Sequence, residues 1–117
     1  MSENVLVTGA GGFIGHHLVS FLKEKGYWVR GVDIKDPEYS ASSADEFKLL
    51  DLRKWESCLE ATQDIDVVYN LAADMGGIGY ITAFLADIAR NNTLINTHMI
   101  EAARTNKVER FFYSSSA

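Results

Sequence analysis

The stretch VLVTGAGGFIG, from Val5 to Gly15, decides the fold of this chain. Its apolar start predicts a buried strand that ends at Thr8, and the residues after it predict a helix that begins at Gly12. Gly9 would allow the tight turn, Gly12 would let the backbone approach a ligand, and Gly15 would let the helix pack closely on the strand. Helix N-termini attract phosphate through unpaired N–H groups and a partial positive charge. The stretch therefore predicts a pyrophosphate site, whereas a lone glycine-rich turn would be a plain loop.

An acidic residue follows at the spacing of a dinucleotide-binding βαβ unit. A second apolar run ends at Asp33, about 18 residues after Gly15. A carboxylate there can accept hydrogen bonds from both hydroxyls of the adenosine ribose. It would repel a 2′-phosphate, so NAD is favoured over NADP, although Lys35 would partly offset that repulsion. The alternative is an aspartate that caps the turn after the strand.

Strands alternate with helices along the whole chain. The predicted strands are 4–8, 28–33, 46–50, 66–71 and 108–114, and the predicted helices are 12–25, 54–61 and 80–105. Gly26 would cap the first helix, and the last helix would be interrupted near Asn91 and Asn92. This alternation predicts an α/β fold, a Rossmann-like doubly wound parallel sheet of order 3-2-1-4-5 with helices on both faces. Ligands bind such sheets beyond the carboxyl ends of the strands.

Composition limits the remaining classes of function. The 117 residues suit one domain, and a hydrophobic content of 47% suits a real core. The net charge of −5, with scattered acidic residues, argues against nucleic acid or an anionic membrane as partner. Cys58 is the only cysteine and is expected in the core. Without a signal peptide, a membrane span or a metal motif, we expect a soluble, cytoplasmic protein that holds no metal.

Five motifs carry a resemblance to a known family. They are Thr8–Gly15, Asp51-Leu52-Arg53, Asn70-Leu71-Ala72-Ala73, the segment from Asn92 to Ala103, and Arg110–Ser116. Through them the chain resembles the extended short-chain dehydrogenase/reductase family, which includes the NAD-dependent epimerases and dehydratases. The runs Leu71–Gly79, Asn91–Thr93 and Met99–Arg104 are similar to the GDP-mannose 3,5-epimerase branch of that family.

The resemblance implies NAD as the cofactor and assigns residues to it. Those that would hold the cofactor are Gly9, Gly12, Phe13, Ile14 and Gly15 at the pyrophosphate, Asp33 at the ribose, Asp51 and Leu52 at the adenine, Leu71, Ala72 and Ala73 along its length, and Asn92 behind the nicotinamide. Asp51 could instead cap the helix after it, and Asn92 could mark a helix kink or cap.

The resemblance also implies a nucleotide-sugar substrate of the GDP-mannose class. Gly76 would contact that substrate, and Ser116 would be a catalytic residue that hydrogen-bonds the reacting sugar oxygen. Both positions have an ordinary alternative: the turn around Gly76 could be a plain connection, and a serine run at a strand end could be turn chemistry.

Two catalytic features of the family are missing from the 117 residues. The family's acid/base is a tyrosine four residues before a lysine, and none of the five tyrosines has that partner. A cysteine expected directly after Ala117 is also missing. We therefore expect residues 1–117 to be the NAD-binding part of an epimerase that oxidises its sugar transiently, to lack the substrate domain, and to be inactive alone. The alternatives are a 4-epimerase or 4,6-dehydratase fragment, or a non-catalytic dinucleotide-binding module.

We also expect a twofold homodimer. The last predicted strand, with Phe111, Phe112 and Tyr113, would form an apolar sheet edge. A helix face would lose its cover beside it. That face consists of Ile95, Met99, Ala102 and Ala103.

Overall fold

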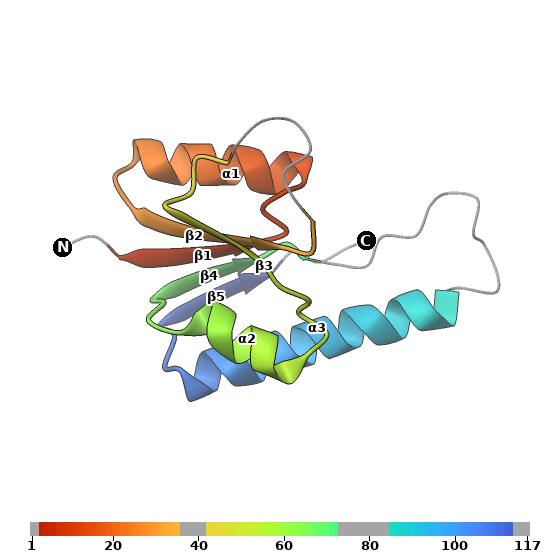
Figure 1. The fold of residues 1–117 in the computed structure, drawn as a ribbon. Coiled ribbons are helices and arrows are strands. Elements are labelled where there is room, and N and C mark those ends of the chain that lie inside the picture. Colours follow the sequence, from red (N-terminus) through yellow and green to blue (C-terminus); the bar gives the residue numbers. More distant parts are fainter. Residues whose placement is uncertain (1–2, 36–41, 73–84, 114–117) are drawn as a thin grey trace.

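A five-stranded parallel sheet forms the centre of the molecule (Figure 1). The computed structural model describes residues 3–35, 42–72 and 85–113, with the backbone alone for 85–93 and 113. The elements are β1 (Asn4–Thr8), α1 (Phe13–Glu24), β2 (Trp28–Asp33), β3 (Glu46–Leu49), α2 (Trp55–Thr62), β4 (Val67–Asn70), α3 (Leu85–Thr105) and β5 (Arg110–Tyr113). The strand order β3-β2-β1-β4-β5 confirms the predicted fold class and topology.

The central strand β1 explains why the sequence there is continuously apolar. It pairs with β2 on one side and with β4 on the other, and its side chains point alternately to the two faces of the sheet. Leu6 packs in the core cluster beneath α2 and α3, whereas Val5 and Val7 pack in the cluster beneath α1 (Figure 1). With helices over both faces, every residue of the strand must be apolar or hydrogen-bonded.

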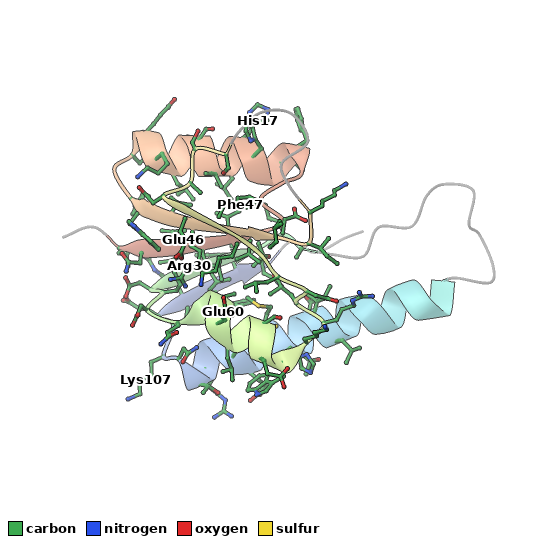
Figure 2. All side chains as sticks on the ribbon, in the orientation of Figure 1. His17, Arg30, Glu46, Phe47, Glu60 and Lys107 are labelled. Carbon is green, nitrogen blue, oxygen red and sulfur yellow. The ribbon has the colours of Figure 1, made fainter. Side chains whose placement is uncertain are left out.

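A buried arginine fastens α2 to the sheet. Arg30 of β2 donates from Nε to Glu46 Oε1 at 2.5 Å and from Nη1 to the carbonyl oxygens of Ala61 and Gln63, both at 2.8 Å. Figure 2 shows Arg30 between the sheet and α2, close to Glu46 of the neighbouring strand. The guanidinium therefore satisfies carbonyl groups at the C-terminal end of α2, near the amino ends of the strands.

The helix α3 differs from its predicted form. It runs without interruption from Leu85 to Thr105, so the predicted break near Asn91 and Asn92 is wrong. Burial of one helix face stabilises the helix more than two asparagines weaken it. The predicted turns of this helix before residue 85 lie outside the described residues.

The expected exposed face of α3 is also wrong. Ile95, Met99, Ala102 and Ala103 are 7%, 0%, 0% and 5% exposed, because this face is the one that α3 buries against the rest of the core. Within the described part of the chain, β5 does form one edge of the sheet, and its Phe112 is 47% exposed. Only the strand half of the expected dimer surface therefore remains.

Among the described residues, no helix combines the length and the apolar character needed to span a membrane.

Candidate functional site

The turn between β1 and α1 has the geometry that its glycines require. Gly9 has a φ of +70°, and a Cβ built there would lie 3.0 Å from the carbonyl carbon of Leu71. The turn closes with a hydrogen bond from the Gly12 N–H to the Gly9 carbonyl oxygen at 3.2 Å. Gly9 is therefore fixed both by its backbone conformation and by the close approach of the chain after β4.

The other two glycines of the motif differ in what surrounds them. A Cβ on Gly15 would lie 2.8 Å from the carbonyl carbon of Gly9, so packing of α1 on the turn requires this glycine. Gly12 has an extended backbone, with φ −82° and ψ 176°, and the nearest described atom to a Cβ there is the Gly9 carbonyl oxygen at 3.5 Å. The described residues thus explain Gly9 and Gly15 but give no reason for glycine at position 12.

The N-terminus of α1 is built to meet an anion. Gly12 is its N-cap residue and has no side chain to bond the first N–H groups, and the described first turn contains no acidic residue. Phe13 and Ile14, which follow directly, are 62% and 70% exposed. Because a helix N-terminus carries a partial positive charge, this end of α1 suits a phosphate group.

Asp33 lies at the end of β2, where its carboxylate contacts the same turn. Oδ2 accepts a hydrogen bond from the Gly11 N–H at 2.8 Å, and Oδ1 accepts one from the Ile34 N–H at 2.7 Å. These bonds hold the carboxylate beside the glycine turn. They include a turn contact with Ile34, so the ribose interpretation and the turn interpretation of Asp33 are compatible.

Gly11 is a site residue that the sequence interpretation missed. A Cβ on it would lie 2.9 Å from Asp33 Oδ2 and 3.2 Å from the Lys35 carbonyl oxygen. The glycine pair at positions 11 and 12 was visible in the sequence, but only the three spaced glycines were assigned roles. Its partner lies 22 residues away, and local spacing does not reveal such a contact.

Asp51 follows β3 at the same edge of the sheet and is paired with an arginine. Its Oδ1 accepts from Arg53 Nε at 3.0 Å and its Oδ2 from Arg53 Nη2 at 2.9 Å. The side-chain hydrogen bond from Arg53 lowers the pKa of Asp51 below its ordinary value. Lys54 is the N-cap residue of α2, so the alternative role of Asp51 as that helix cap is wrong.

Leu52 and Cys58 belong to the core beneath this edge. Leu52 is 4% exposed, and its carbonyl oxygen accepts a hydrogen bond from Cys58 Sγ at 3.1 Å. Cys58 is 0% exposed within the core cluster, which confirms its assignment as a core residue, and this burial raises the pKa of its thiol to about 12. The Leu52 side chain is therefore committed to packing, and any contact with an adenine ring falls to its backbone or to its remaining exposed surface.

The end of β4 is organised by buried polar side chains. Thr8 Oγ1 donates to Asn70 Oδ1 at 2.6 Å and accepts from the Ala72 N–H at 3.0 Å. Asn70 Nδ2 donates to Asn96 Oδ1 of α3 at 3.1 Å. Leu71 and Ala72, which the sequence assigned to the cofactor, thus lie directly beside Gly9.

The structure does not describe the side chains of the remaining predicted site residues. Asn92 lies within α3, of which the backbone alone is described at that position. Ala73, Gly76 and Ser116 lie outside the described residues. The residues that the structure does bring together at the carboxyl edge are the glycine turn, Asp33, Asp51, Leu71 and Ala72.

Known proteins with similar sequences include enzymes that are named for GDP-sugars. The chain is 50% identical to GDP-mannose 3,5-epimerase of Arabidopsis thaliana over 120 residues, which cover 99% of this chain and 32% of that protein. It is 30% identical to GDP-L-fucose synthase of Escherichia coli, covering 98% of this chain and 33% of the enzyme. The chain thus spans about a third of the length of these relatives.

Solved structures share the fold, and family membership follows from the sequence. A complex of MoeE5 with UDP-glucuronic acid and NAD has a TM-score of 0.81 and 34% identity, covering 97% of this chain and 36% of that one. A UDP-galactose 4-epimerase has a TM-score of 0.81 and 27% identity, covering 97% and 38%. Residues 5–117 match the family described as the NAD dependent epimerase/dehydratase family. This chain belongs to that family, whose cofactor is NAD.

Proposed function

We propose that this chain is the NAD-binding part of a nucleotide-sugar epimerase of the GDP-mannose 3,5-epimerase type. The observation that carries the proposal is Gly12. Its backbone is extended, and a Cβ there would meet only an ordinary contact among the described residues, so the described part of the fold would accept a side chain. A ligand that approaches the backbone supplies the missing reason for glycine, because a pyrophosphate must reach the helix N-terminus closely.

Each side of the proposed site has its own task. The first N–H groups of α1 would bind the pyrophosphate, and Asp33 would accept hydrogen bonds from the adenosine ribose. Asp51, at the end of β3, would accept a hydrogen bond from the adenine amino group while Arg53 keeps it ionised. Leu71, Ala72 and Ala73 would line the path toward the nicotinamide. When bound, NAD supplies a reversible hydride acceptor.

The substrate proposal rests on the 50% identity to a GDP-mannose 3,5-epimerase over nearly the whole chain. Transient oxidation of the sugar would acidify the neighbouring carbons and so permit proton exchange. In the complete protein Gly76 would contact the nucleotide-sugar and Ser116 would hydrogen-bond the reacting oxygen. A single NAD-binding domain at residues 1–117, a cytoplasmic location and a homodimer through β5 stay predictions.

Gly12→Val tests cofactor binding most directly. The variant should fold as the wild type does, because a Cβ at this position meets only an ordinary contact. It should bind NAD at least about tenfold more weakly, because its side chain blocks the pyrophosphate. Calorimetric titration measures the affinity and circular dichroism checks the fold. Normal NAD binding by Gly12→Val would show that this glycine has no role in the site.

Asp33→Asn tests the choice between NAD and NADP. The amide oxygen can still accept from the Gly11 N–H, but the charge that repels a 2′-phosphate is removed. The wild type should prefer NAD, and the variant should bind the two cofactors more equally. A wild type that binds NADP as tightly as NAD contradicts this part of the proposal.

We propose that residues 1–117 are inactive by themselves, and incubation with GDP-mannose and NAD tests this. Because the 117 residues contain no tyrosine with a lysine four residues later, product analysis should show no epimerised sugar above buffer. Turnover that Ser116→Ala abolishes would show instead that these residues suffice for catalysis.

A further inference from the structure

A chain of buried and partly buried hydrogen bonds connects α3 with the glycine turn. We call it the relay, and it consists of Asn96, Asn70, Thr8 and the backbone N–H of Ala72. Asn70 Nδ2 donates to Asn96 Oδ1 at 3.1 Å, Thr8 Oγ1 donates to Asn70 Oδ1 at 2.6 Å, and the Ala72 N–H donates to Thr8 Oγ1 at 3.0 Å. Every member therefore has a partner, and the relay continues from a helix, through two strands, to the chain after β4.

Two members of the relay are buried where polar groups cost free energy. Thr8 and Asn70 are 0% and 2% exposed, and they are the last residues of β1 and β4, directly opposite one another in the register. Burying a hydroxyl and an amide costs free energy unless both are hydrogen-bonded, and apolar side chains of similar size would avoid that cost. Polar residues at these two positions indicate a requirement for orientation rather than for burial alone.

What the relay orients is the narrowest part of the site. A Cβ on Gly9 would lie 3.0 Å from the Leu71 carbonyl carbon and 3.1 Å from the Ala72 nitrogen, and the relay holds that same nitrogen through Thr8. The strand order reverses here, because β1 continues to β2 on one side while β4 lies on the other. A dinucleotide binds across such a switch point, with one half over each side.

We propose that Asn96 is a positioning residue for the cofactor, acting through Asn70 and Thr8 to fix the separation between the glycine turn and the end of β4. This inference rests on the proposed binding of NAD. Asn96 itself touches no part of the site among the described contacts. It acts at a distance, and its loss leaves the Asn70 amide without its partner and releases the end of β4.

Two ligands distinguish positioning from general stability. NAD spans both halves of the switch point, whereas AMP occupies only the half over β1, β2 and β3. A displaced end of β4 should therefore weaken NAD and leave AMP nearly unaffected. Loss of stability alone would weaken both ligands to the same extent.

The chain provides a matched control just after the C-terminus of α3. Asn106 also ties the α3 region to its neighbour, because its Nδ2 donates to the Leu59 carbonyl oxygen at 3.0 Å and to Thr62 Oγ1 at 2.9 Å. It follows the C-terminus of α3, which lies by the amino ends of the strands, away from the site (Figure 1). Asn96→Ala and Asn106→Ala thus remove the same side chain, although Asn96 accepts one hydrogen bond through Oδ1 and Asn106 donates two through Nδ2.

The experiment titrates NAD and AMP into the full 117-residue chain and into both variants, with urea unfolding as the measure of stability. Asn96→Ala should weaken NAD about tenfold and AMP by less than about twofold. Asn106→Ala should lower the urea midpoint comparably and change neither affinity by more than about twofold. Equal losses for both ligands, or an Asn96→Ala variant that binds NAD normally, would overturn the inference.

Two further variants decide the matter if Asn96→Ala does not fold. Asn96→Asp keeps an acceptor for Asn70 Nδ2 and should bind NAD as the wild type does, whereas Asn96→Gln moves the amide by one methylene and should weaken NAD selectively. Identical affinities in these two variants would contradict the relay. A wild type that binds no NAD would overturn the proposed function together with this inference, whereas unaffected Asn96 variants overturn the inference alone.

Discussion

At the turn between β1 and α1 the candidate site is shaped by the backbone, whereas at the end of β4 it is shaped by side chains. The turn depends on glycines whose added Cβ atoms would meet backbone or Asp33, and backbone N–H groups donate its bonds, to Gly9 within the turn and to Val32 and Asp33 of β2. The end of β4 depends on Thr8, Asn70 and Asn96, whose bonds join residues 62 and 26 positions apart. Close approach of the backbone thus forms one half of the site, and hydrogen bonds between side chains form the other.

The largest loss of stability is expected at Gly15 in the turn between β1 and α1, where the backbone has no space for a side chain. Gly15→Ala places a Cβ 2.8 Å from the Gly9 carbonyl carbon, inside a helix where alanine is otherwise the better residue. We expect a loss of about 3 kcal/mol in the free energy of unfolding, measured in urea. Gly12→Ala is the matched control and should stay within about 0.5 kcal/mol. Equal stability of the two variants would mean that α1 can move away from the turn.

The side-chain half should be the next most sensitive. Thr8→Val preserves shape but removes the hydroxyl that serves both Asn70 and the Ala72 N–H. The buried Asn70 oxygen and the partly buried Ala72 N–H then lose their partner, and we expect about 2 kcal/mol of destabilisation by urea unfolding. Thr105→Val removes an exposed hydroxyl that bonds the Glu101 carbonyl oxygen and should cost less than about 0.5 kcal/mol. A harmless Thr8→Val would show that water or local shifts replace the relay.

Gly11→Ala examines a place where backbone and side chain meet. The added Cβ would lie 2.9 Å from Asp33 Oδ2, so the carboxylate must turn and weaken its bond to the position 11 N–H. We expect about 1 kcal/mol of destabilisation and a smaller preference for NAD over NADP. Parallel titrations with the two cofactors measure that preference. If Gly11→Ala is less stable but keeps its preference for NAD over NADP, the contact between Asp33 and the turn has no influence on cofactor selection.

The smallest effect concerns the exposed ion pair at the end of β3. Arg53 lowers the pKa of Asp51, so the pair stabilises the fold above about pH 4, and this stabilisation is lost as the pH falls through the lower pKa of the folded state. The Arg53 side chain is 44% exposed, so its contribution is less than about 1 kcal/mol. Arg53→Gln should raise the pKa of Asp51 in an NMR titration of its carboxyl carbon. If Asp51 titrates at the same pH in Arg53→Gln as in the wild type, Lys54 or backbone contacts lower its pKa instead of the Arg53 side chain.

The sequence predicted the features that depend on local spacing. The bounds of β1 and β2 agree with the predictions, and the glycine motif, the position of Asp33 and the sheet order follow from residues that lie close together in the chain. Hydrophobic periodicity and glycine placement carry that information directly.

The missed features depend on contacts between distant residues. Asn96 looked like one polar residue among several in α3, and nothing nearby pointed to Asn70. The interruption expected at Asn91 and Asn92 followed local helix propensity, which tertiary packing of Ile95 and Met99 overrides. The same packing buries the helix face that was expected to be exposed.

The rate at which an alkylating reagent modifies Cys58 reports how often the protein opens locally. Cys58 is the only cysteine, it is 0% exposed, and a pKa of about 12 leaves almost no thiolate at neutral pH. An alkylating reagent can therefore modify it only during excursions that expose α2 and the end of β3, and the modification rate counts those excursions. Because its Sγ bonds the Leu52 carbonyl oxygen, next to Asp51, a ligand bound at that edge must slow the reaction in proportion to its occupancy.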